Sequence, residues 1–159
     1  MGKYIIRGGK PLYGNVTVSG SKNAALPVLF ATLLTHGESE IVNLPSIGDV
    51  ECALDIISSL GARVRRVGNT AYINTETLEY SVPDSESVSR IRASTYLIGS
   101  CLARFGRAEL LCFGGCNFSK RPIDLHIQCA ESFGASLTDN TLEANTATNR
   151  NTVNAKTAE

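Results

Sequence analysis

The segment 112–126, CFGGCNFSKRPIDLH, combines the residue types of a reactive loop. Cys116 follows two glycines, and the cations Lys120 and Arg121 come shortly after it. A thiol can act as a nucleophile or a proton donor, and nearby cations favour both its thiolate form and a bound phosphate. Cys116 is therefore either a chemical group held on a loop or a small apolar residue that follows a turn.

Three segments each place a cation at or just before the start of a predicted helix. They are SGSKNAA with Lys22, IRAS with Arg92 and KRPID with Arg121. Free backbone N–H groups and the helix dipole favour an anion at such a position, and the cation adds to this preference. Each segment alone is more typical of a capped helix with an exposed cation. The three together predict a substrate that carries several phosphate charges.

Other chemistries fit the spacing less well. SGSKN does not match a phosphate-binding P-loop, because it lacks both the required spacing to an upstream glycine and the Lys-Ser/Thr pair. A cysteine phosphatase needs five residues between its cysteine and arginine, and Cys116 and Arg121 enclose four. His126 is a candidate base for Cys116, although a lone histidine in a helix is more often structural. The remaining cysteines are expected to be packing residues in helices or an apolar strand: Cys52, Cys101, Cys112 and Cys129.

Composition narrows the class of protein. The chain has 159 residues, enough for one ordinary domain, and its 15 Lys and Arg balance 15 Asp and Glu. This balance gives no electrostatic reason to expect a nucleic acid or an anionic membrane as a partner. No secretory or membrane-spanning pattern is present, and the cysteines show neither CxxC nor zinc spacing. We therefore expect a cytoplasmic protein without a metal or another cofactor.

Helical and strand patterns alternate along the chain. After a predicted hairpin over 7–20, the pattern predicts helices over 21–37, 48–62, 85–106 and 122–134. Strands are predicted over 39–44, over 63–74 as a hairpin that turns at Gly68 and Asn69, over 108–113, and from 135. This alternation predicts an α/β fold.

The two halves of this pattern are similar to each other. Aligning Gly37 with Gly106 gives an offset of 69 residues, and aligning Gly61 with Gly134 gives 73. The four extra residues of the second copy fall in FGGCNFSKR, where added loop length beside a cysteine favours a functional role. The first offset also makes Arg92 the equivalent of Asn23, so these two helix starts should lie at the same end of the fold.

Several motifs resemble one known family. SGSKNAALPVLFATLL, LGA, RAS and GGCNFSKRPIDLH stand as they do in the UDP-N-acetylglucosamine 1-carboxyvinyltransferases, which are enolpyruvyl transferases of bacterial peptidoglycan synthesis. The resemblance covers residues 3–138, and its lysine-asparagine and cysteine-loop motifs are highly specific. The sister enzyme of aromatic amino-acid synthesis shares the fold but lacks the cysteine loop. The implied fold is the family's inside-out α/β barrel of repeated helix–strand units, incomplete here.

The resemblance also implies roles for individual residues. Lys22 and Asn23 would contact phosphoenolpyruvate and the sugar. Cys116 would donate a proton to the methylene carbon of phosphoenolpyruvate and could also form a covalent adduct with it. The 3′-hydroxyl of UDP-N-acetylglucosamine would then attack, and phosphate would leave. The residues implied to bind the UDP-sugar are Arg92, Arg121, Pro122, Ile123, Asp124 and Leu125.

The chain also departs from the family. The family enzyme has two domains and over twice this length, and its general base lies outside the resemblance. We expect residues 1–21 to form N-terminal strands that pair with a second domain. Residues 22–138 should form a partial first domain with two repeats. Residues 139–159 are rich in Asn and Thr and should be a disordered tail after at most one short strand. An incomplete core predicts self-association. Two alternatives stay open: a non-catalytic UDP-sugar-binding remnant, and an unrelated cysteine enzyme that acts on a phosphorylated metabolite.

Overall fold

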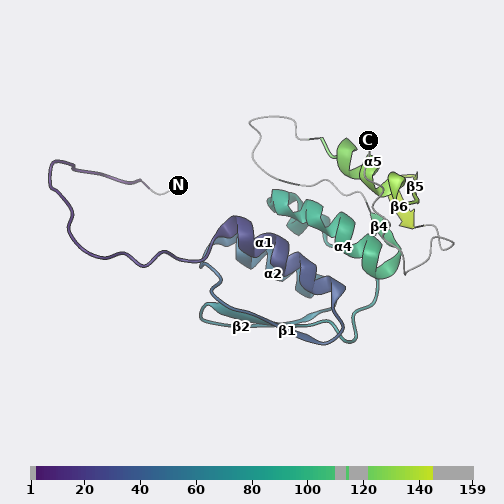
Figure 1. Cartoon of the computed structure of the whole chain (residues 1–159), viewed down its shortest axis with the longest axis horizontal. Helices are drawn as coiled ribbons and strands as arrows, with labels where there is room; N and C mark the ends of the chain where they lie inside the picture. Colours follow the sequence, from purple (N-terminus) through teal and green to yellow (C-terminus); the bar gives the residue numbers. More distant parts are fainter. Residues whose placement is uncertain (1–2, 110–113, 115–121, 145–159) are drawn as a thin grey trace, which may run out of the picture.

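The first half of the chain forms two helices packed on a three-stranded sheet. The computed structural model describes residues 3–109, 114 and 122–144. The elements of the first half are α1 (Lys22–Ala31), the 3-10 turn η1 (Thr32–Leu34), β1 (Glu38–Ile41), α2 (Gly48–Ser59), β2 (Arg63–Val67) and β3 (Thr70–Asn74). The sheet is antiparallel in the order β1-β3-β2, and α1 and α2 cover one of its faces (Figure 1).

The second half repeats this arrangement. Its elements are α3 (Ser85–Arg90), η2 (Arg92–Thr95), α4 (Tyr96–Phe105), β4 (Arg107–Glu109), α5 (Asp124–Ser132), β5 (Ala135–Thr138) and β6 (Thr141–Ala144). The strand order β4-β6-β5 matches β1-β3-β2, and all pairs are antiparallel. The α/β class and the repeated helix–strand unit predicted from the sequence are therefore confirmed.

The strand register fixes how the two units align. Glu38 pairs with Asn74 in the first sheet and Arg107 with Glu143 in the second, so both partners are shifted by 69 residues (107 − 38 and 143 − 74). The glycines that were aligned from the sequence share the left-handed conformation, with φ of 115° and 74° at Gly37 and Gly106. The sequence alignment of the two halves therefore has a structural basis.

The core lies between α1, α2 and α4 and the first sheet. Its fully buried side chains include Leu29, Phe30, Leu33, Val50, Ile56, Ile57 and Ile73. The spacing of these residues in α1 and α2 follows the helical period, which is why each helix presents one apolar face. The Ser100 hydroxyl of α4 donates a hydrogen bond to the Phe30 carbonyl oxygen at 2.9 Å, so the second unit is attached to α1 inside the core.

Arg104 joins the two units at the other end of α4. Its guanidinium donates to the carbonyl oxygens of Leu33 (3.4 Å), Thr35 and Thr75 (2.9 Å), which terminate η1 and follow β3. One planar cation thus satisfies carbonyl groups from two segments of the first unit. These hydrogen bonds hold α4 against α1. They thereby also help to position the residues that precede α4.

The single helix predicted over 85–106 is wrong. The chain leaves the helical conformation at Ile91 (φ −130°, ψ 141°), which separates α3 from η2 and α4. The buried Ser94 hydroxyl contacts the carbonyl oxygens of Val88 (2.8 Å) and Ile91 (2.6 Å), and such side-chain bonds compete with helical backbone bonds. Because of the break, Arg92 is the first residue of η2 and not an interior residue of one long helix.

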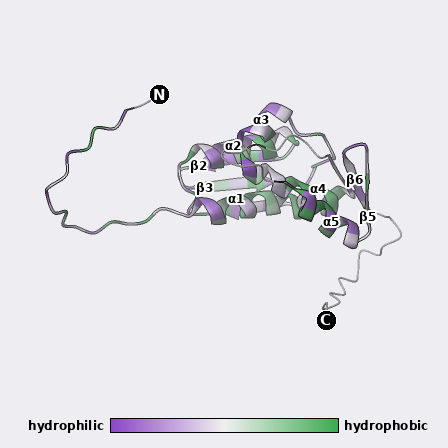
Figure 2. Ribbon diagram, turned by 90° about the horizontal axis from the view of Figure 1, so that it is seen from above, coloured by the Kyte–Doolittle hydropathy of each residue, from purple (hydrophilic) through white to green (hydrophobic). Residues whose placement is uncertain are grey.

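The N-terminal segment is an extended arm. Residues 3–21 form neither helix nor strand, so the predicted hairpin over 7–20 is wrong. Figure 2 shows the arm running away from the helices and sheets. Its large apolar side chains are almost fully exposed, with Tyr4 at 93% and Leu12 at 96%. Pairing with a second domain stays a prediction for this arm.

The last described residues form a hairpin. The strand start predicted at 135 is confirmed as β5, and the positive φ of Asp139 and Asn140 turns the chain into β6. β6 is the one short strand that the sequence allowed before the predicted disordered tail. Residues 145–159, which make up the rest of that tail, lie outside the described residues.

Candidate functional site

A polar pocket lies where the starts of α1, α2 and η2 meet. Its cavity volume is about 260 Å³. The residues that line it are Lys22, Asn23, Leu26, Pro27, Asp49, Arg92, Ala93, Thr95 and Tyr96. The charged members are two cations and one carboxylate, so the lining carries one net positive charge. A pocket of this size and charge suits a small anionic molecule.

The start of α1 is positioned by close backbone contact. A Cβ atom on Gly20 would lie 1.9 Å from the Asn43 carbonyl oxygen, so only glycine allows this approach. The following Ser21 is the N-cap, and its carbonyl oxygen accepts the Ala25 N–H at 2.9 Å. Lys22 and Asn23 are therefore the first two residues of the helix, where free N–H groups favour an anion.

Pro27 modifies the same helix turn. It lies inside α1, where its ring nitrogen has no hydrogen to donate to the carbonyl oxygen of Asn23, four residues earlier. Asn23 and Pro27 both line the pocket. The Asn23 carbonyl oxygen therefore lacks its normal helical partner at the place where a ligand would lie.

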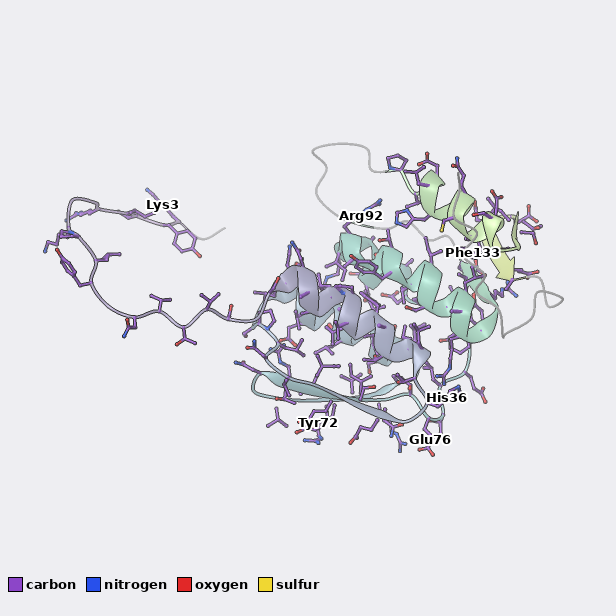
Figure 3. All side chains as sticks on the ribbon, viewed as in Figure 1. Lys3, His36, Tyr72, Glu76, Arg92 and Phe133 are labelled. Carbon is purple, nitrogen blue, oxygen red and sulfur yellow. The ribbon has the colours of Figure 1, made fainter. Side chains whose placement is uncertain are left out.

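Arg92 connects the pocket to the segment that precedes α5. Its Nη2 donates a hydrogen bond to the Pro122 carbonyl oxygen at 3.4 Å. Arg92 projects from the start of the α4 ribbon in Figure 3. The predicted site segments around Lys22, Arg92 and Pro122 thus meet at one end of the fold, as the repeat alignment predicted for the first two.

The remaining predicted binding residues lie along the start of α5. Ile123 is half-buried against the core, and Asp124 is the exposed first residue of α5. Leu125 is 71% exposed and does not line the pocket. Cys116 and Arg121 lie in 115–121, outside the part of the chain that the structure describes. Their predicted roles therefore stay predictions.

Gly114 is the described residue that lies next to the cysteine loop in the sequence. Its N–H donates to the Val88 carbonyl oxygen at 3.3 Å, the same oxygen that accepts from Ser94. A Cβ atom on Gly114 would lie 1.7 Å from the Ser89 carbonyl oxygen. The backbone two residues before Cys116 is therefore held against the corner between α3 and η2, which also carries Arg92.

The described cysteines differ in environment. Burial raises the pKa of Cys101 to about 11, and burial, opposed by nearby Arg90, raises the pKa of Cys52. Both are core residues, as predicted. The prediction that Cys129 is a core residue is wrong, because Ala130 is the buried residue of α5 and Cys129 is exposed. His126, the alternative base, is also exposed on α5, and Cys112 falls outside the described residues.

Asp49, Thr95 and Tyr96 are polar or aromatic residues of the pocket that sequence analysis did not assign to a site. Asp49 Oδ2 lies 3.1 Å from Lys22 Nζ, and Thr95 and Tyr96 add a hydroxyl and an aromatic ring. Tyr96 rests against Phe30 with ring centroids 6.4 Å apart. No pattern in the sequence signals the Asp49 contact, because it depends on how α2 packs beside α1. Among residues 3–109, 114 and 122–144, no cluster of potential metal ligands is present.

Comparisons with known proteins identify the family. The sequence profile of EPSP synthase (3-phosphoshikimate 1-carboxyvinyltransferase) matches residues 6–157. The chain belongs to the EPSP synthase family. The UDP-N-acetylglucosamine 1-carboxyvinyltransferase of Buchnera aphidicola subsp. Schizaphis graminum is 42% identical over 137 residues, covering 86% of this chain and 33% of that protein. The corresponding protein 3 of Caldanaerobacter subterraneus subsp. tengcongensis is 46% identical over 138 residues, covering 87% and 33%.

A solved structure supports the same fold. The crystal structure of the enolpyruvyl transferase NikO from Streptomyces tendae superposes with a TM-score of 0.71 at 24% identity, covering 86% of this chain and 31% of that chain. The fold is therefore that of the enolpyruvyl transferases, as the sequence predicted. The chain spans about a third of the length of the curated relatives it matches. None of its described helices is long and apolar enough to cross a membrane.

Proposed function

We propose that this chain is part of an enzyme that transfers the enolpyruvyl group of phosphoenolpyruvate to the 3′-hydroxyl of UDP-N-acetylglucosamine and releases phosphate. The observation that carries the proposal is the meeting of Lys22, Asn23 and Arg92, from distant parts of the sequence, in one pocket. The relatives' names support the choice of substrates. In this proposal the pocket binds phosphate-bearing groups, since helix starts and cations converge there.

The proposed chemistry assigns a separate task to each group. Lys22 and Asn23 hold phosphoenolpyruvate, and the Cys116 thiol gives its proton to the methylene carbon and also forms a covalent adduct with this substrate. The sugar hydroxyl loses its proton to the general base, which lies outside residues 3–138, and forms the new carbon–oxygen bond at the adjacent carbon. The methyl carbon then gives up a proton as the bond to phosphate breaks, which restores the double bond of the enolpyruvyl group. The residues proposed to hold the UDP-sugar are Arg92, Arg121, Pro122, Ile123, Asp124 and Leu125.

A second cavity is a weaker candidate for a phosphate. It has a volume of about 320 Å³ on the outer face of the first sheet and contains Arg63 and Arg65. Arg65 lies over the Tyr72 ring at 4.1 Å, and Arg63 lies 3.9 Å from a Glu76 oxygen, so both cations already have partners. Tyr72 and Glu76 lie on the opposite side of the molecule from Arg92 (Figure 3).

The biological setting follows from the proposed reaction. A UDP-N-acetylglucosamine carboxyvinyltransferase opens peptidoglycan synthesis, so we propose a cytoplasmic role in cell-wall formation, with its consequences for cell shape and division. The proposed reaction is acid–base chemistry on two soluble substrates and needs no metal or other cofactor. Neither a nucleic acid nor a membrane is a proposed partner, and residues 1–21 are proposed to pair with a second domain.

Arg92→Ala is expected to weaken binding of UDP-N-acetylglucosamine about tenfold or more, because a charge-assisted contact at the pocket is lost. Isothermal titration calorimetry on the chain measures the change. Arg90→Ala is the matched control, since Arg90 is an exposed cation at the end of α3 and does not line the pocket. Equal losses in both variants would show that only net charge is sensed, and the proposed site would then be wrong.

We also propose that the chain self-associates through the exposed face of the second unit. The large apolar side chains there are Leu125, Phe133 and Leu137, which are 71%, 66% and 41% exposed. Sedimentation velocity is expected to show a dimer or larger species at micromolar concentration. A double substitution of Leu125 and Phe133 by serine should shift the chain to a monomer. A wild-type chain that sediments as a monomer and binds no hydrophobic dye would contradict this prediction.

A further inference from the structure

The proposed function leaves the carboxylate in the pocket unexplained. Asp49 Oδ2 lies 3.1 Å from Lys22 Nζ, and the two side chains remain 43% and 51% exposed. A carboxylate at this place repels an anionic substrate and cancels part of the lysine charge. By charge alone, Asp49 should weaken binding of a phosphate in this pocket.

The packed helices fix the backbone from which the short Asp49 side chain extends. Lys22 is the first residue of α1, and Asp49 lies in the first turn of α2. The two helices pack against each other, and each carries fully buried residues, such as Leu29 in α1 and Val50 in α2. The lysine side chain, by contrast, has a flexible four-carbon stem that loses rotamer freedom whenever its ammonium is held in one place.

We propose that Asp49 is a positioning residue that holds the Lys22 ammonium at the pocket before substrate binds. The ordering of the lysine side chain is then complete in the free protein and does not oppose binding of phosphoenolpyruvate. The identity of the substrate rests on the proposed function, whereas the effect of Asp49 on Lys22 does not depend on it. Arg92, the other cation of the lining, contacts the Pro122 backbone instead.

Charge and positioning predict opposite results for Asp49→Ala. If Asp49 acts only through its charge, its removal tightens binding of phosphoenolpyruvate and of inorganic phosphate to the chain. If Asp49 instead positions Lys22, Asp49→Ala weakens binding of phosphoenolpyruvate about fivefold, which is equivalent to about 1 kcal/mol. Asp55→Ala is the control, because Asp55 is an exposed carboxylate of the same helix outside the pocket. Unchanged or tighter binding by Asp49→Ala in calorimetry overturns the inference.

A second measurement needs no substrate. Reductive methylation with ¹³C-formaldehyde labels each lysine and keeps its charge, and the Lys22 signal is assigned by its loss in Lys22→Arg. In the wild type this signal should differ in shift and relaxation from those of Lys3, labelled on the arm in Figure 3, and Lys10, which is also exposed in residues 3–21. In Asp49→Ala it should move to join them.

The two measurements separate the inference from the proposed function. A Lys22 signal that is the same in the wild type and Asp49→Ala contradicts positioning, whatever the chain binds. A signal that changes as expected in a wild-type chain that binds no phosphoenolpyruvate supports positioning of Lys22 and contradicts the proposed substrate.

Discussion

Cys116→Ser is expected to abolish turnover, with a loss of at least about a thousandfold in kcat. The reason is that a cysteine thiol has an unperturbed pKa of about 8.5 and gives up its proton far more readily than a serine hydroxyl. The measurement is phosphate release by a chimera in which residues 3–138 replace the matching segment of the Buchnera relative. Wild-type-like turnover by Cys116→Ser would make the cysteine a packing residue.

Cys116→Asp provides the matched control in the same chimera. An aspartate carboxyl has an unperturbed pKa of about 3.9 and must be raised towards neutrality by a dry loop to donate a proton. We expect this variant to retain part of the activity. Intact-mass measurement after incubation with both substrates should show a covalent adduct on the wild type and none on Cys116→Asp. An adduct on the aspartate variant would place the covalent step on another residue.

Gly114→Ala is expected to lower the free energy of unfolding of the chain by about 2–3 kcal/mol. The added Cβ would lie 1.7 Å from the Ser89 carbonyl oxygen and 2.2 Å from its carbon, which are backbone atoms of α3. The backbone must therefore move, and the bond from Gly114 N–H to the Val88 carbonyl oxygen would be lost. Urea denaturation measures the difference in stability.

Gly99→Ala is the control for this stability prediction. Gly99 lies within α4, and a Cβ atom there meets nothing within 4 Å. Alanine is the better helix former, so this variant should be as stable as the wild type or slightly more stable. If Gly114→Ala unfolds at the same urea concentration as Gly99→Ala, the contact between the start of the cysteine loop and α3 does not hold in solution.

Local sequence signals predicted much of the fold. The hairpin at Gly68 and Asn69 and the paired units aligned through Gly37 and Gly106 depend on turn residues whose conformations are set within a few positions. The pocket cations Lys22 and Arg92 could also be predicted, because their neighbours mark helix starts and the repeat places them at one end.

Features that depend on packing could not be predicted in this way. The break at Ile91 needs the buried Ser94 hydroxyl, and the exposure of Cys129 depends on which elements cover α5. The hairpin predicted near the N-terminus fails because its apolar side chains, such as Leu12, find no covering surface among the described residues. Asp49 was missed because the contact with Lys22 joins the ends of two helices that only tertiary packing brings together.

Phosphate release by the chimera tests the central claim most directly. Each substrate is supplied alone and then both together, and inorganic phosphate is measured with a coupled assay. Enolpyruvyl transfer predicts release only when phosphoenolpyruvate and UDP-N-acetylglucosamine are both present, and a loss of most of this release in Arg92→Ala. Release from phosphoenolpyruvate alone, or binding of both substrates with no release, would contradict the claim.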